Sequence, residues 1–198
     1  MAEDFAALKT EIRACTVCEP DLPRGARPII RGAATSRILV VGQAPGVLAH
    51  ESATPFNDPS GRRLRAWMGV SDAEFYDEAR VAIAPMGFCY PGQDARGGDR
   101  PPRPECAPLW QARVRAALPA LELTVLVGAH AQRFHLGRRA RRTLTETVLH
   151  WRECWPEFIA LPHPSWRNNA WLKRNPWFEA DVLPALHSRV RSILERAE

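Results

Sequence analysis

The 198-residue sequence is poor in lysine, and it contains neither a long apolar run nor a basic-then-apolar leader. Without an apolar run of about 18 residues, no membrane-spanning helix is expected. Without a leader, secretion is not expected either. We therefore expect a soluble, cytoplasmic protein that has no membrane partner.

Arginine supplies almost all of the positive charge, because Lys9 and Lys173 are the only lysines among 27 basic residues. The formal net charge is +5 and the isoelectric point is about 9.3. This balance suits a phosphate-rich partner without requiring one. The densest basic run, residues 138–142, contains four arginines. Such runs usually lie on a solvated face of the protein, and only a minority of their arginines contact phosphate.

Length and composition indicate one globular domain, spanning residues 1–198. Hydrophobic residues make up 45% of the chain and charged residues 25%, which is ordinary for a protein with a buried core. The sequence has no repeat and no segment typical of a domain linker. We expect a single-domain monomer.

Four apolar segments alternate with stretches of helical spacing along the chain. The expected strands are residues 37–42, 81–86, 123–127 and 158–162. Helices are expected at 2–14, from about Ser60, at the capping box 71–74, and at 105–118, 129–136 and 178–196. This alternation predicts an α/β fold, a three-layer α/β/α sandwich around a four-stranded, mainly parallel sheet.

Two of the expected strands end in turns that suit ligand binding. The first strand runs into GQAPG, residues 42–46, and a polar loop then leads to Phe56. The fourth strand ends in PHPS, residues 162–165. Open parallel sheets bind ligands at the carboxyl ends of their strands, and a glycine-rich turn lets backbone N–H groups approach a ligand. The first turn alone is also typical of an ordinary strand-to-helix connection, but the second motif favours a binding site.

The five cysteines do not suggest a disulfide framework in a chain without a leader. Cys15 and Cys18 form a C-x2-C pair beside a helix end, while Cys89 and Cys106 bracket a polar loop rich in glycine and proline. Four thiolates suit either tetrahedral zinc or a [4Fe–4S] cluster, and spacing does not separate the two. We interpret Cys154, which has no partner in this pattern, as a core thiol.

The two strand-end motifs, GQAPG…PF and HPS, resemble motifs 1 and 2 of the uracil-DNA glycosylase superfamily, most closely those of its iron–sulfur family 4. The resemblance follows the order of elements over nearly the whole chain. It implies base-excision repair: hydrolysis of the N-glycosidic bond of uracil or a related deaminated base in DNA, leaving an abasic site. It also implies a [4Fe–4S] cluster, rather than zinc, on Cys15, Cys18, Cys89 and Cys106.

A glycosylase must hold a flipped base, stabilise the charge that develops on the leaving base, and place a water near the sugar. Phe56 is suited to stacking on a planar base. His163 is suited to donating a hydrogen bond to the base carbonyl that gains charge. The resemblance implies further groups around the base and its phosphate: Gly42, Gln43, Ala44 and Ser165.

Motif 1 contains no acidic residue. Family 4 has Glu where Gln43 stands, and the Asp with which some other relatives orient water is replaced by Ala44, as in family 4. Placement of the water would then fall to another polar residue of the first loop: His50, Glu51 or Asp58.

The loop after HPS lies where the family inserts residues into the duplex. Trp166 or Arg167 could fill the gap left by a flipped base, and Asn168 belongs to the same expected DNA surface. Trp171 and Trp177 are expected to pack the C-terminal helix instead.

We expect a monofunctional DNA glycosylase, because neither lysine lies near a motif and a Schiff-base lyase needs an amine. Pro85 stands where relatives carry the Asn that reads uracil, which leaves the excised base open. One alternative is a glycosylase for deaminated purines. Another is a protein of the same fold that binds lesions or single strands with weak or no cleavage.

Overall fold

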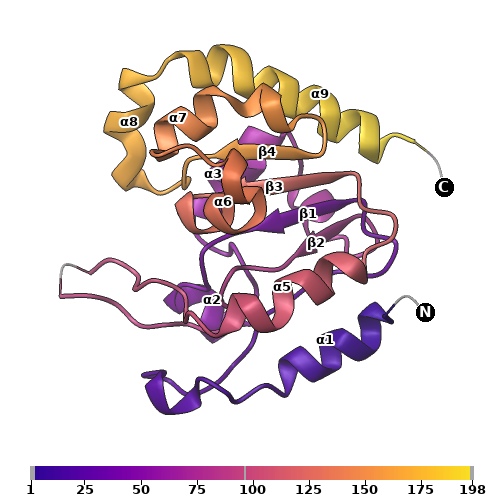
Figure 1. The fold of residues 1–198 in the computed structure, drawn as a ribbon, viewed down its shortest axis with the longest axis vertical. Coiled ribbons are helices and arrows are strands. Elements are labelled where there is room, and N and C mark those ends of the chain that lie inside the picture. The colour runs from indigo at the N-terminus through magenta and orange to yellow at the C-terminus, as the bar shows by residue number, and fades with distance from the viewer. Residues whose placement is uncertain (1–2, 96, 197–198) are drawn as a thin grey trace.

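The computed structural model describes residues 3–95 and 97–196. At its centre is a four-stranded parallel sheet with the strand order β2-β1-β3-β4 (Figure 1). All of its strand residues are buried, as expected for a parallel sheet covered on both faces. The strands are β1 (Ile38–Val41), β2 (Val81–Ile83), β3 (Leu123–Val127) and β4 (Phe158–Leu161).

Alternating side chains of each strand enter two separate cores, because successive residues of a strand point to opposite faces. In β1, Ile38 and Val40 belong to one core, while Leu39 and Val41 belong to the other. The register pairs Val40 with Ile83 on one side and with Val125 on the other. The apolar run at residues 38–41, from which the strand was predicted, thus reflects burial of both faces of β1.

Helices cover both faces of the sheet, which confirms the predicted three-layer α/β/α sandwich (Figure 1). The face on which Ile38 lies packs against α3 (Pro59–Met68), α4 (Asp72–Phe75), α7 (Leu144–Leu149), a π-helical turn (Phe178–Val182) and α9 (Leu183–Leu194). The opposite face packs against α1 (Phe5–Arg13), α5 (Cys106–Ala116) and α6 (Ala129–Leu136).

Several predicted boundaries need correction. The second strand ends at Ile83 rather than at residue 86, although the Ala84 and Met86 N–H groups still donate to the Val40 and Gly42 carbonyls. The first loop contains a short helix, α2 (Val47–Ser52), which ends at Ala53 in the left-handed region. The expected helix 178–196 is a π turn followed by α9. The capping box at Ser71 is confirmed, and a second one at Thr143 opens α7, where no helix was predicted.

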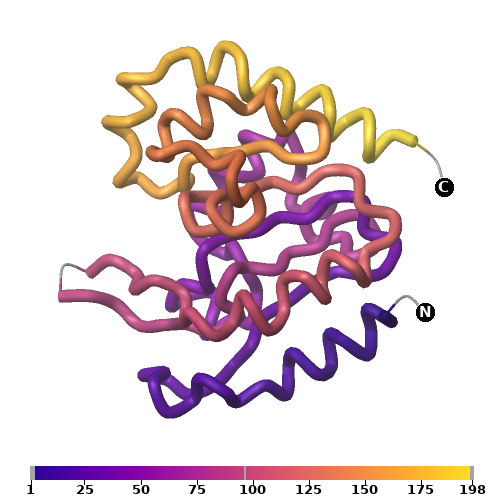
Figure 2. The backbone as a smooth tube through the Cα atoms, viewed as in Figure 1, coloured from indigo at the N-terminus to yellow at the C-terminus, as the bar shows by residue number. Residues whose placement is uncertain are grey.

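Two segments flank the carboxyl edge of the sheet. One is the 90–104 hairpin, in which Gln93 and Asp99 form an antiparallel bridge. The other is α8 (Asn169–Arg174), reached from β4 through a 3₁₀ turn at Trp166–Asn168. Figure 2 shows the hairpin projecting from the body on the side where α8 lies, away from the start of α1 and the end of α9. None of the helices in the described part of the chain has the length and apolarity to cross a membrane.

Candidate active site

A cavity of about 260 Å³ opens at the carboxyl edge of the sheet. Its walls come from segments far apart in sequence: the turn after β1, the loop around α2, the end of β2, the hairpin, and the residues after β4. The structure thus brings the two predicted motifs into one site. The predicted residues that line it are Gly42, Gln43, Ala44, Phe56, Asp58, His163 and Ser165.

Pro85 lies in the wall of the cavity formed by the end of β2. The flanking chain is tied to the motif 1 turn, because the Met86 N–H donates to the Gly42 carbonyl at 2.9 Å. The Pro85 carbonyl accepts the buried Gln111 amide at 2.7 Å. With no side-chain donor and no N–H, Pro85 cannot donate a hydrogen bond to a base, and its carbonyl already accepts one from Gln111.

Phe56 forms the wall beside motif 1, and its backbone adopts the left-handed conformation with a φ of 56°. Its ring lies so close to Gly42 that a Cβ on Gly42 would come within 2.9 Å of it. Phe75 contacts the ring edge-on, with 6.1 Å between centroids. Glycine at position 42 therefore lets the ring approach the strand end, where it presents a flat apolar surface to the cavity.

Gly61→Ala is expected to lower the free energy of unfolding by about 3 kcal/mol, the upper part of the range for overpacking. An added Cβ would lie 1.7 Å from the Phe56 carbonyl oxygen, so the Phe56 loop or the start of α3 must move. Denaturant unfolding measures the change. The control is Gly46→Ala, whose Cβ would make only an ordinary 3.5 Å contact with Asp99. Equal stability of the two variants would contradict this account of Phe56.

His163 follows β4 and presents a neutral imidazole to the cavity. Burial lowers its pKa, which Asp58 and Asp99 partly offset. Its Nδ1 accepts the Ser165 N–H at 3.2 Å, so the ring hydrogen resides on Nε2. The Asn168 side chain donates to the His163 carbonyl at 2.7 Å and fixes the turn. The site therefore holds an uncharged hydrogen-bond donor at the end of the strand.

The acidic residues of the first loop separate in space. Asp58 lines the cavity, although one of its oxygens caps α3 by accepting the Gly61 N–H at 2.7 Å. Glu51 lies outside the cavity lining and pairs with Arg24 at 2.7 Å. His50 packs against Tyr90 and is also absent from the lining. Of the three candidates for placing water, only Asp58 faces the site.

Sequence reasoning missed Asp99, which reaches the cavity from the hairpin together with Gln93. The Gln93 side chain donates a hydrogen bond to the Asp99 carboxylate. Partial burial raises the pKa of Asp99, and nearby Asp58 raises it further, while Gln93, His163 and Arg167 counteract this. No sequence signal marked this residue, because its position depends on how a long loop folds back over motif 1.

A rim of exposed apolar and cationic groups adjoins Ser165, a residue of the cavity lining. Trp166 is 71% exposed, and the Arg167 guanidinium lies over its ring at 5.5 Å from the centroid. On the α2 side, Leu48 lines the cavity and is 48% exposed. Ser165 caps the turn by accepting the Arg167 N–H at 3.2 Å. This rim combines apolar surface with positive charge.

The four paired cysteines line a second cavity, between the N-terminal segment and the start and end of the hairpin. Backbone N–H groups point at the sulfurs: that of Phe88 reaches Cys106 at 3.4 Å, and that of Arg27 reaches Cys89. Burial raises the pKa of the Cys106 thiol to about 12 and that of Cys89 to about 11. Without a cation these are thiols; a bound metal would favour the thiolates.

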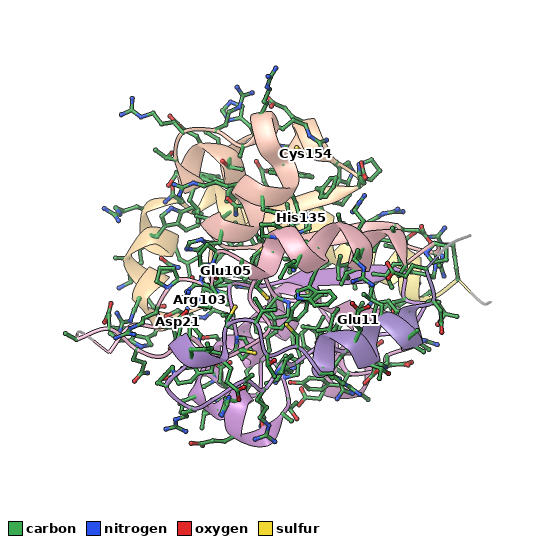
Figure 3. The ribbon with its side chains drawn as sticks, turned by 60° about the horizontal axis from the view of Figure 1, so that its bottom comes forward. Glu11, Asp21, Arg103, Glu105, His135 and Cys154 are labelled. Carbon is green, nitrogen blue, oxygen red and sulfur yellow. The ribbon has the colours of Figure 1, made fainter. Side chains whose placement is uncertain are left out.

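Arg103 ties the two segments that carry these cysteines. It contacts Asp21 at 2.7 Å and Glu105 at 3.1 Å, and the three residues lie together in Figure 3. Cys154 lies well apart from them in the same view, buried in the core, as predicted from its isolation in the sequence. Among the described residues, no three His, Cys, Asp or Glu side chains are grouped closely enough to hold one metal ion.

Comparison with known proteins gave one family and several solved structures. The family model described as the uracil DNA glycosylase superfamily matches residues 29–187. A solution NMR structure of a candidate uracil DNA glycosylase from Methanosarcina acetivorans is 15% identical, with a TM-score of 0.48. The match covers 82% of this chain and 97% of that one. This structural similarity is too low to bear on function.

Proposed function

The chain belongs to the uracil DNA glycosylase superfamily, and we propose that it is a single-domain, monofunctional DNA glycosylase that excises a deaminated base and leaves an abasic site. The observation that carries the proposal is the pairing of Phe56 with His163 in one cavity. One residue offers a flat apolar face and the other a neutral N–H donor. Together they match two of the three requirements of base excision, holding a flipped base and stabilising its negative charge.

The cavity can take a base only after the base has left the duplex stack. Phe56 would then stack on it, an interaction worth about 1–3 kcal/mol per base. As the bond from C1′ to the base nitrogen breaks, its electron pair moves onto the base. The His163 Nε2–H would donate to the carbonyl oxygen that gains this charge. The backbone N–H groups of Gln43 and Ala44 are proposed to bind the same base.

A lyase step is not part of the proposal, because no lysine lines the cavity in the described part of the chain. The Lys9 ammonium is bound to Glu78 at 2.9 Å, on the N-terminal helix. Lys173 lies on α8, outside the cavity lining. Without an amine nucleophile at the sugar, the expected product is an intact strand with an abasic site.

The excised base is uracil or a deaminated purine. Pro85 cannot supply the amide that would select uracil, so reading of the base would fall to the backbone of motif 1 and to other polar groups of the lining. Gln93 has a side-chain amide there. Purine lesions therefore have to be assayed beside uracil.

We propose a [4Fe–4S] cluster held by Cys15, Cys18, Cys89 and Cys106. Zinc is the alternative, although no three of these sulfurs are grouped closely enough to hold a single ion. The fit is one of chemistry: four soft donors line one cavity, and N–H groups directed at two of the sulfurs would stabilise their thiolates. Such a group would fasten the N-terminal segment to both ends of the hairpin. We assign it this structural task and no step of the reaction.

DNA would approach the rim formed by Trp166, Arg167 and Asn168. Arg167→Ala is expected to weaken DNA binding several-fold and to reduce the salt slope of binding by about one, as for the loss of one phosphate contact. Lys173→Ala, on the following helix, is the matched control and should change the slope less. Fluorescence anisotropy over a salt series measures both, and an unchanged slope for Arg167→Ala would remove this loop from the interface.

The proposed activity is tested with duplex and single-stranded oligonucleotides containing uracil, hypoxanthine or xanthine, followed by alkaline cleavage. The expected result is an alkali-labile site at one or more of these bases and none in undamaged DNA. Tight binding to lesion DNA without any alkali-labile site would support the alternative function of lesion binding. That alternative is motivated by the absence of an acidic residue in motif 1.

A further inference from the structure

The hairpin between Cys89 and Cys106 is tied directly to motif 1. The Gln43 side-chain amide donates to the Arg100 carbonyl at 2.9 Å. Arg100 in turn donates its N–H to the Gly92 carbonyl at 2.9 Å, which closes the base of the hairpin. A glutamate at position 43 would have only acceptors to offer to that carbonyl. The glutamine that departs from the family pattern is therefore the residue that anchors the hairpin.

The residue next to this anchor is Asp99, which the hairpin directs at the cavity. Its carboxylate lies beside the backbone of Gly46, since a Cβ built on Gly46 would be 3.5 Å from Oδ2. It also lies within electrostatic range of His163, Asp58 and Arg167. The carboxylate thus stands over the motif 1 turn, facing the histidine on the other side of the cavity.

We propose that Asp99 places and activates the attacking water, and that Gln43 is the positioning residue that holds Asp99 there. This inference rests on the proposed glycosylase function. The acid missing from the motif 1 turn is supplied by the hairpin instead, and the glutamine that departs from the family pattern at position 43 holds the hairpin in place. Asp58, the other carboxylate of the lining, is held in the cap of α3 by the Gly61 N–H, whereas Asp99 belongs to the hairpin that Gln43 holds.

The proposed step is a hydrolysis. The bond between C1′ and the base nitrogen breaks, and its electron pair leaves with the base, whose carbonyl oxygen accepts a hydrogen bond from His163. The water oxygen forms the new bond to C1′, and its proton passes to the Asp99 carboxylate. The proton then returns through solvent to the departing base. One water is consumed, and one free base and one abasic site are formed.

The test is single-turnover base release by Asp99→Asn, at saturating enzyme, on a lesion that the wild type cleaves. The rate is expected to fall by about 100-fold or more, the scale of one general base. Asp99→Glu should recover part of the loss, and affinity for abasic product DNA should stay within about threefold. The matched control is Asp94→Asn on the same hairpin. Asparagine at position 94 keeps an acceptor for the Gly98 N–H, which donates to Asp94 at 2.9 Å. The rate of base release by this variant should stay within about threefold of the wild-type rate.

Gln43→Met tests the positioning role, because methionine keeps the volume and removes the donor. It should lower the saturated rate about tenfold or more without changing product affinity. In combination with Asp99→Asn, Gln43→Met should reduce the rate of base release little further, because the effects of substitutions at coupled residues are not additive. Base release by Asp99→Asn within threefold of wild type would overturn the role of Asp99, and full additivity would overturn that of Gln43. A wild type that releases no base would instead overturn the proposed function, and this inference with it.

Discussion

His163→Ala is expected to slow base release by about two to three orders of magnitude, the cost of removing one donor from a developing oxyanion. The structure gives the physical reason: Nδ1 is committed to the Ser165 N–H, so Nε2 carries the hydrogen that faces the cavity. Burial keeps the pKa of this imidazole below its ordinary value, so the donor is neutral near pH 7. Single-turnover rates on lesion DNA measure the loss.

Affinity for abasic DNA should change much less in this variant, because the interaction strengthens mainly as charge develops. His163→Gln, which keeps an N–H donor, should retain more activity than the alanine variant. The control is His150→Ala, an exposed histidine whose Nδ1 lies 2.8 Å from the Glu146 carbonyl of its own helix. Wild-type rates for His163→Ala would remove His163 from the chemistry.

Cys106→Ala is expected to abolish binding of the proposed cluster and to lower the melting temperature by about 10 °C or more, because the binding energy of a structural metal group is folding energy. Cys106 begins α5 and ends the hairpin, and its sulfur accepts the Phe88 N–H. Without the cluster, the hairpin that carries Asp99 would lose one of its anchors. Iron and sulfide content per chain, the visible absorption spectrum and thermal unfolding measure the effect.

Cys154→Ala is the matched control, since this cysteine is buried in the core, apart from the other four. It should leave the iron content unchanged and cost about 1 kcal/mol of stability, as for other small losses of core volume. Full metal content and an unchanged melting temperature in Cys106→Ala would show that Cys106 is not a ligand. Zinc in place of iron and sulfide would identify the alternative metal.

The sequence predicts the sheet well because two-sided burial leaves a plain signal. Residues 38–41 are apolar throughout, residues 123–127 are apolar except for Thr124, and each segment forms a fully buried strand. Since the carboxyl ends of parallel strands share one edge, the motifs after β1 and β4 could be expected to meet there, and they line one cavity. The positions of Phe56 and His163 follow from the same reasoning.

The rest of the site could not be predicted, because it depends on contacts between distant segments. Asp99 reaches the cavity only through the Gln43 amide and the folding of a hairpin that has no apolar pattern. Glu51 has the same acidic chemistry and lies closer to motif 1 in sequence, yet it turns away to Arg24. Proximity along the chain gave three candidates without choosing among them, of which Asp58 lines the cavity, and it gave no reason to consider Asp99.

The most direct test of base excision is detection of the released base. Wild-type protein in excess over uracil-, hypoxanthine- or xanthine-containing DNA should release one equivalent of the free base, measured by mass spectrometry, from at least one of the three substrates. The DNA strand should remain intact until alkali is added. His163→Ala, treated in parallel, should release the same base more slowly by about 100-fold or more. The account would be contradicted if the protein binds all three lesion substrates and releases the base from none of them.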